Sequence, residues 1–90
     1  MSSSLQNLTG DIARLSDGRI YGKVRAIQGI LVEIGGVQNF LSVGDRCTLI
    51  GRRDERVACE VVGFRDDRAL AMPFGALDGI GLGSAAEVGE

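Results

Sequence analysis

The sequence predicts an all-β domain, a small closed six-stranded β-barrel preceded by a short N-terminal helix or flexible segment. Three observations support this fold class. Apolar and polar residues alternate along several short stretches, and glycines or charged residues separate these stretches at intervals of about 8–12 residues. The third observation is the length, because 90 residues leave room for one domain. Closure into a barrel is favoured because an open six-stranded sheet would expose a face and two edges.

Residues 1–18 differ from the rest of the chain and are expected to form a separate partner-binding segment. Leucine and isoleucine recur there at steps of three and four, which places them on one face of a helix. Ser4 is a candidate cap and Gly18 a stop signal, whereas Gly10 weakens the helix by about 1 kcal/mol. The apolar stripe either packs on the chain's own barrel, frays, or docks on a partner helix. Its members are Leu5, Leu8, Ile12 and Leu15.

Residues 19–90 are assigned to the barrel, and its first two strands follow each other closely. The first strand spans residues 20–28, with Val24 and Ala26 expected on one face because side chains alternate along a strand. The second strand spans residues 30–34 and begins after a turn glycine. Its inward-facing residues are expected to be Ile30, Val32 and Ile34, opposite Glu33.

Four further strands complete the predicted barrel. Cys47 and Leu49 are expected to point inward from the third strand, and a charged hairpin loop leads to the fourth. A second charged turn precedes the fifth strand, where Pro73 indicates an edge or an exit from the sheet. A glycine-rich stretch comes before the last strand. These strands are expected at residues 46–50, 57–64, 69–74 and 85–88.

The composition argues against several classes of function. Ten basic residues among twelve acidic ones give a net charge of −2, which does not suit a nucleic-acid partner. Histidine is absent, so no imidazole is present for metal binding or for proton transfer at neutral pH. Cys47 and Cys59 lie in apolar runs and are expected to be free, buried thiols. The chain carries no recognisable signal peptide or apolar span of about 20 residues, so we expect a cytosolic protein without membrane insertion.

The motifs that could carry chemistry are incomplete. Residues 79–84 read Gly-Ile-Gly-Leu-Gly-Ser, but a dinucleotide-binding fingerprint needs a following helix and a distant acidic residue. The surroundings of Lys23 do not match a phosphate-binding loop. The acidic pairs at residues 54–55 and 66–67 are flanked by arginines and are expected to be solvated turns rather than metal sites. We therefore expect no active site, metal or cofactor in this chain.

Five segments occur in a fixed order that resembles a known family, namely Gly29–Ile34, Val43–Cys47, Cys59–Phe64, Ala71–Gly75 and Asp78–Ile80 with Gly83. Together they are similar to the N-terminal domain of the flagellar and type III secretion ATPases, relatives of the rotary ATP synthase α and β subunits. The resemblance covers most of the chain after residue 18. Residues 69–75 favour the flagellar type, with the injectisome type as the alternative.

The resemblance implies the head of a ring-forming ATPase that energises protein export at the inner membrane. In that family ATP and Mg bind a central α/β domain, which would follow residue 90, so no catalytic residue is carried over to this chain. Ring assembly would use contacts between barrels of neighbouring subunits. The segment 1–18 would bind a stator-like regulatory protein that holds the ATPase at the export apparatus, on the cytoplasmic side.

The two charged turns are the candidate ring contacts, because mixed charges suit a head-to-tail interface. Ordinary solvated loops are the alternative interpretation. The rival function is a free-standing ligand- or RNA-binding barrel, which would need a basic, aromatic face. Only Tyr21, Lys23 and Arg25 could contribute to such a face. The candidate contact residues are Arg52, Arg53, Arg56, Arg65, Asp66, Asp67 and Arg68.

Overall fold

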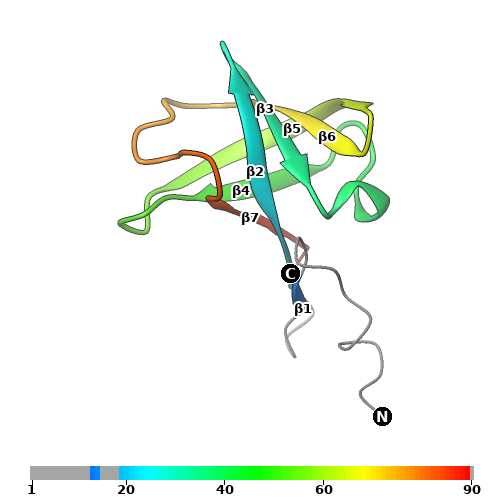
Figure 1. Ribbon diagram of the computed structural model, residues 1–90, viewed down its shortest axis with the longest axis horizontal. Coiled ribbons are helices and arrows are strands. Elements are labelled where there is room, and N and C mark those ends of the chain that lie inside the picture. Colours follow the sequence, from blue (N-terminus) through cyan, green and yellow to red (C-terminus); the bar gives the residue numbers. More distant parts are fainter. Residues whose placement is uncertain (1–12, 15–18, 90) are drawn as a thin grey trace.

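The computed structural model describes residues 13–14 and 19–89, and these form an antiparallel β-barrel (Figure 1). Six strands close the barrel in the order β2-β3-β6-β5-β4-β7, because β7 pairs back onto β2. The predicted closed six-stranded barrel is therefore confirmed. Its strands are β2 Ile20–Gln28, β3 Leu31–Gly35, β4 Arg46–Ile50, β5 Arg56–Arg65, β6 Arg68–Pro73 and β7 Ala85–Val88, with a 3-10 turn, η1, at Gln38–Phe40.

A seventh, very short strand extends the sheet beyond the barrel. β1 (Ala13–Arg14) pairs antiparallel with the start of β2, with Ala13 opposite Tyr21 and Arg14 opposite Ile20. These two residues belong to the segment 1–18, and at this point the backbone is extended rather than helical. The apolar stripe itself, Leu5, Leu8, Ile12 and Leu15, lies outside the described residues, so its helix stays a prediction.

The barrel interior is filled by small and medium-sized apolar side chains. Among the residues that the structure describes, thirteen hydrophobic ones are buried, and Ile34, Leu49 and Val61 are fully inaccessible to solvent. Burying a side chain of this size contributes about 1.5–3 kcal/mol, so the core supplies the main stabilisation of this small domain. As predicted, Cys47 and Leu49 point inward. Cys47 also lies directly opposite Cys59 across β4 and β5, and both thiols are free.

A bulge in β2 overturns one prediction about which residues face the core. The pairing of β2 with β3 shifts between Val24 and Ala26, so Arg25 is an extra residue in β2. Val24 lies opposite the inward-facing Ile34, but Ala26 lies opposite Glu33 on the outer face. The expectation that Val24 and Ala26 share a face was therefore wrong. A bulge reverses the alternation and bends the strand, which helps a short sheet to close.

The turn between β2 and β3 overturns a second prediction. Ile30 was expected to face the core with Val32, but its side chain is 64% exposed. Gln28 pairs with Leu31, which leaves Gly29 and Ile30 as a two-residue turn. Gly29 has a φ of +62°, a conformation that glycine adopts without steric cost, so the turn is placed there and the strand begins one residue later.

Candidate functional site

The seven charged candidate residues lie in or directly beside two turns at opposite ends of one strand. β5 has ten residues and runs from Arg56 to Arg65, a length of about 30 Å at roughly 3.3 Å per residue. The β4–β5 loop precedes this strand, and the β5–β6 turn, Asp66–Asp67, follows it. Figure 1 shows the loop at the left edge of the barrel and the turn at the right edge. The structure therefore does not gather the candidates into one site but places them on two flanks.

The β4–β5 loop is held in shape by hydrogen bonds to its own backbone and to a neighbouring segment. The backbone N–H of Gly51 donates to the carbonyl of Glu55 at 2.7 Å, and that of Arg53 donates to Oε1 of Glu55 at 2.8 Å. The N–H of Arg52 donates to the carbonyl of Gly79, at 3.3 Å, in the segment between β6 and β7. Glu55 therefore fixes the path of this loop.

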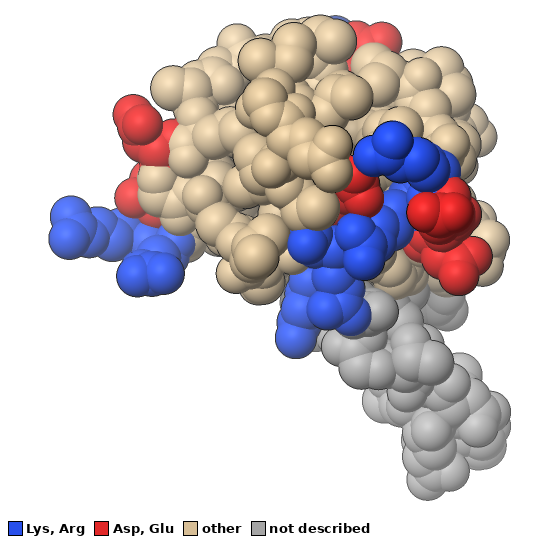
Figure 2. Space-filling view, turned by 45° about the horizontal axis from the view of Figure 1, so that its top comes forward, with Lys and Arg blue, Asp and Glu red and all other residues tan. Residues whose placement is uncertain are grey.

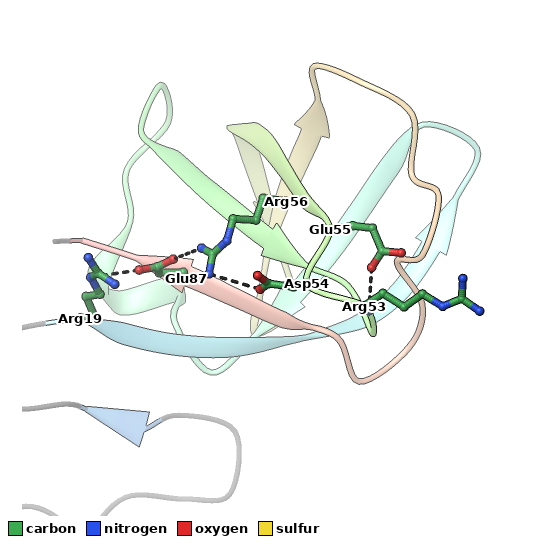
Figure 3. A network of polar contacts seen from close by, with 6 residues as sticks. All are labelled: Arg19, Arg53, Asp54, Glu55, Arg56 and Glu87. Carbon is green, nitrogen blue, oxygen red and sulfur yellow. Dashed lines mark hydrogen bonds and ion pairs between the residues drawn. The ribbon is translucent and has the colours of Figure 1, made fainter.

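A chain of ion pairs continues from this loop along the barrel (Figure 3). Arg56 contacts Asp54 at 3.4 Å and Glu87 of β7 at 3.3 Å. Glu87 in turn contacts Arg19 through its other oxygen at 3.1 Å. The charge of Arg56, one of the predicted contact residues, is therefore already balanced within its own barrel.

The β5–β6 turn is held by a buried carboxylate. Glu33 of β3 is only 6% exposed. It accepts hydrogen bonds from Arg65 at 2.6 Å and from Arg68 at 3.0 Å, each through a different oxygen. Hydrogen bonds from Arg65 and then Arg68 hold the pKa of the Glu33 carboxyl below its usual value of 4.5. Both predicted contact arginines of this turn are therefore engaged internally, where they tie β5 and β6 to β3.

Four of the seven predicted residues keep charges that no described residue balances. Arg52 and Arg53 are exposed on the β4–β5 loop, and none of the ion pairs within residues 19–89 involves them. In Figure 3 the side chain of Arg53 points away from Glu55 and from the other labelled charges. Asp66 and Asp67 are likewise exposed and unpaired in that part of the chain. One flank thus carries free positive charge, and the other carries free negative charge.

The glycine-rich segment at residues 79–84 forms tight turns beside the β4–β5 loop. The N–H groups that a phosphate would require are used internally. That of Ile80 donates to Leu77, that of Gly81 to Oγ of Ser84 and that of Gly83 to the carbonyl of Val24. The carboxylate of Glu55 also lies against this segment and would repel an anion. These contacts favour the interpretation of the glycines as turn residues.

One face of the barrel is largely uncharged. Figure 2 shows a broad face without Lys, Arg, Asp or Glu, with the charged side chains gathered along its edges. Exposed apolar residues on the connections between strands include Ile30, Phe74 and Leu82. Within the described residues, no cluster of three potential metal ligands occurs, and no helix is long and apolar enough to cross a membrane.

Sequence reasoning missed Glu33 and Glu87, the two carboxylates that organise the flanks. Glu33 was expected on the outer face, which is correct, but not in a buried position. Its partners Arg65 and Arg68 are 32 and 35 residues away. The alignment of β3 with β6, and of β6 with β5, brings them together, and the sequence holds no local sign of these alignments.

Comparison with known proteins gives consistent matches. The family model described as "ATP synthase alpha/beta family, beta-barrel domain" matches residues 24–87. The chain is 39% identical over 80 residues to a "Flagellum-specific ATP synthase" of Caulobacter vibrioides, which covers 89% of the chain and 18% of the relative. It is 42% identical over 74 residues to a "Type 3 secretion system ATPase" of Xanthomonas euvesicatoria, which covers 81% of the chain and 16% of the relative. The chain thus spans less than a fifth of the length of these relatives.

Proposed function

The chain belongs to the ATP synthase alpha/beta family, as its β-barrel domain, and we propose that it is the N-terminal assembly and regulator-binding domain of a flagellar protein-export ATPase. In this proposal the 90 residues have no catalytic role. ATP and Mg bind a later part of the full-length protein, which hydrolyses ATP in the cytoplasm beside the inner membrane. The match to the barrel domain, over a chain that spans less than a fifth of its relatives, is the observation that carries the proposal.

The barrel contributes to ring assembly through its two flanks. The charged turns lie on opposite sides of the barrel in Figure 1. Arg52 and Arg53 on one turn and Asp66 and Asp67 on the other are exposed and can meet neighbouring subunits. The residues proposed to contribute, directly or by holding the turns in place, are Arg52, Arg53, Arg56, Arg65, Asp66, Asp67 and Arg68.

The segment 1–18 binds a stator-like regulatory protein through its apolar stripe. The spacing of the stripe residues suits an amphipathic helix that lies in a groove of its partner. The double variant Leu8→Asp with Ile12→Asp should abolish regulator binding and leave the melting temperature of the barrel nearly unchanged. A large loss of barrel stability would show instead that the stripe packs on its own domain.

An injectisome ATPase is the alternative parent protein. The observation that favours it is the 42% identity to the Type 3 secretion system ATPase, slightly above the 39% identity to the flagellar relative. Complementation separates the two, because the full-length gene should restore motility to a mutant that lacks its flagellar ATPase. Restoration of injectisome secretion without motility would favour the alternative.

The proposal of a non-catalytic domain is tested by measuring ATP binding to the isolated 90-residue chain and to the full-length protein by calorimetry. The full-length protein should bind ATP at micromolar concentration, and the isolated chain should not. Binding by the isolated chain would mean that the glycine-rich segment at residues 79–84 is a nucleotide site.

A further inference from the structure

The geometry points to a specific head-to-tail contact in which Arg52 and Arg53 of one barrel meet Asp66 and Asp67 of the next. This inference rests on the proposed ring assembly and names the residues and the polarity of its contact. Its starting point is the charge that remains after all internal ion pairs of the described residues are formed. Arg56, Arg65 and Arg68 form ion pairs within the barrel, whereas Arg52 and Arg53 on one turn and Asp66 and Asp67 on the other form none with the described residues.

The positions of the remaining charges suit a second copy of this chain as the partner. The positive pair and the negative pair lie at opposite ends of the ten-residue strand β5, on opposite flanks of the barrel (Figure 1). A two-fold dimer could pair these charges only if one interface contained both patches, because each patch would then meet the opposite patch of the partner. Patches on opposite flanks instead suit a head-to-tail contact, where one patch meets a different patch and repetition around an axis closes a ring.

Both turns are also rigidly built, which lowers the entropic cost of contact. Glu55 accepts the N–H of Arg53 and fixes the β4–β5 loop, while the loop is tied to Gly79 through Arg52. On the other flank, Glu33 holds the β5–β6 turn through two arginines. The internally paired residues therefore act as supports, and the unpaired residues on the same turns are presented to solvent in a fixed position.

Charge reversal on either flank tests this contact in the full-length protein. The acidic variant is Arg52→Glu with Arg53→Glu, and the basic variant is Asp66→Asn with Asp67→Arg. Asparagine is chosen at position 66 because Asp66 has a φ of +56°, which asparagine tolerates better than arginine does. Each variant makes its two flanks alike in sign. The matched control is Lys23→Glu, which reverses an exposed charge on β2 outside both turns.

Each variant alone should require roughly tenfold more protein for half-maximal assembly in sedimentation velocity at low salt. This estimate assumes that each variant loses two exposed ion pairs at the contact between barrels and gains repulsion between like charges in their place. The difference should shrink in about 1 M salt, where charges are screened beyond about 3 Å. The control variant should assemble like the wild type, and circular dichroism should show an intact barrel in all variants.

A mixture of the two variants gives the decisive result. In an alternating ring, the acidic loop of one variant meets the basic turn of the other, and the unchanged loop and turn also meet with opposite signs. Mixing equal amounts should therefore restore assembly to within about twofold of the wild type. A merely structural role of these residues would not produce rescue by mixing.

The outcomes separate this contact from the proposed function. If both variants assemble like the wild type, or if mixing restores nothing, the charge pairing is refuted. The proposed function still stands in that case, provided that removal of residues 1–90 abolishes assembly. If the protein without residues 1–90 assembles normally, the proposed function fails together with the contact.

Discussion

Replacing Gly79 with alanine should destabilise the barrel through the β4–β5 loop. Gly79 has a φ of +83°, and a Cβ atom built on it would collide with the carboxyl group of Glu55. That carboxyl group accepts the N–H of Arg53 and holds the loop. Glu55 would have to move, so the substitution removes a hydrogen bond in addition to straining the backbone.

The size of the effect follows from these two contributions. Alanine in a left-handed conformation costs about 1–2 kcal/mol, and loss of the hydrogen bond costs about 1 kcal/mol. Alanine also restricts the unfolded chain, which offsets about 0.4–1 kcal/mol. The free energy of unfolding should therefore fall by about 2 kcal/mol. For a domain of this size that corresponds to a melting temperature lower by roughly 8–16 °C.

Two glycines in the same segment provide matched controls for thermal denaturation followed by circular dichroism. Gly83 has a φ of +86°, but a Cβ atom at this position would meet no other atom within 4 Å, so Gly83→Ala should cost about 1 kcal/mol from strain alone. Gly81 has neither feature, so Gly81→Ala should be neutral or slightly stabilising. If Gly79→Ala costs no more than Gly83→Ala, Glu55 does not support the loop, and the reasoning is refuted.

Three further predictions follow from the described contacts. Glu33→Gln should lower stability at pH 7, and the difference from the wild type should vanish in acid. The folded-state pKa of Glu33 lies below 4.5, so the stabilisation by its carboxylate is present above that value and is lost as the pH falls through the folded-state pKa. Equal stability of Glu33→Gln and the wild type at pH 7 would contradict this prediction. Cys47 and Cys59 are both buried, and the neighbouring Cys47 sulfur and burial raise the pKa of the Cys59 thiol. Because of their burial, a thiol reagent should label both cysteines only after unfolding, and rapid labelling of the native chain would argue against that burial. The isolated chain should sediment mostly as a monomer at micromolar concentration, because we expect contacts between barrels alone to be smaller than a standard interface. A stable oligomer would oppose this expectation.

Most of the fold could be predicted from local sequence patterns. Alternation and glycine punctuation placed all six barrel strands, and three of them, β2, β4 and β7, were predicted with the observed bounds. The errors arose where the pattern is interrupted. Arg25 reads as an ordinary strand residue, yet it is the extra residue of a bulge that moves Ala26 to the outer face. Ile30 reads as a core residue, yet it is the second residue of the turn between β2 and β3 and its side chain is exposed.

The candidate site could be predicted only in part. The charge runs marked the two turns, but a run of mixed charges does not reveal which of its members are paired. Arg56 and Arg65 look like Arg52 in sequence, and they differ because strand pairing brings Glu87 and Glu33 to them. Such partners are distant along the chain, so separating supporting charges from free charges required the three-dimensional arrangement.

The central claim, that this barrel serves assembly rather than chemistry, is tested most directly by ATP hydrolysis as a function of protein concentration. The full-length protein should gain specific activity as its concentration rises, because subunits assemble. The same protein without residues 1–90 should show low specific activity that does not change with concentration. An equal, concentration-dependent rise in the truncated protein would contradict the account.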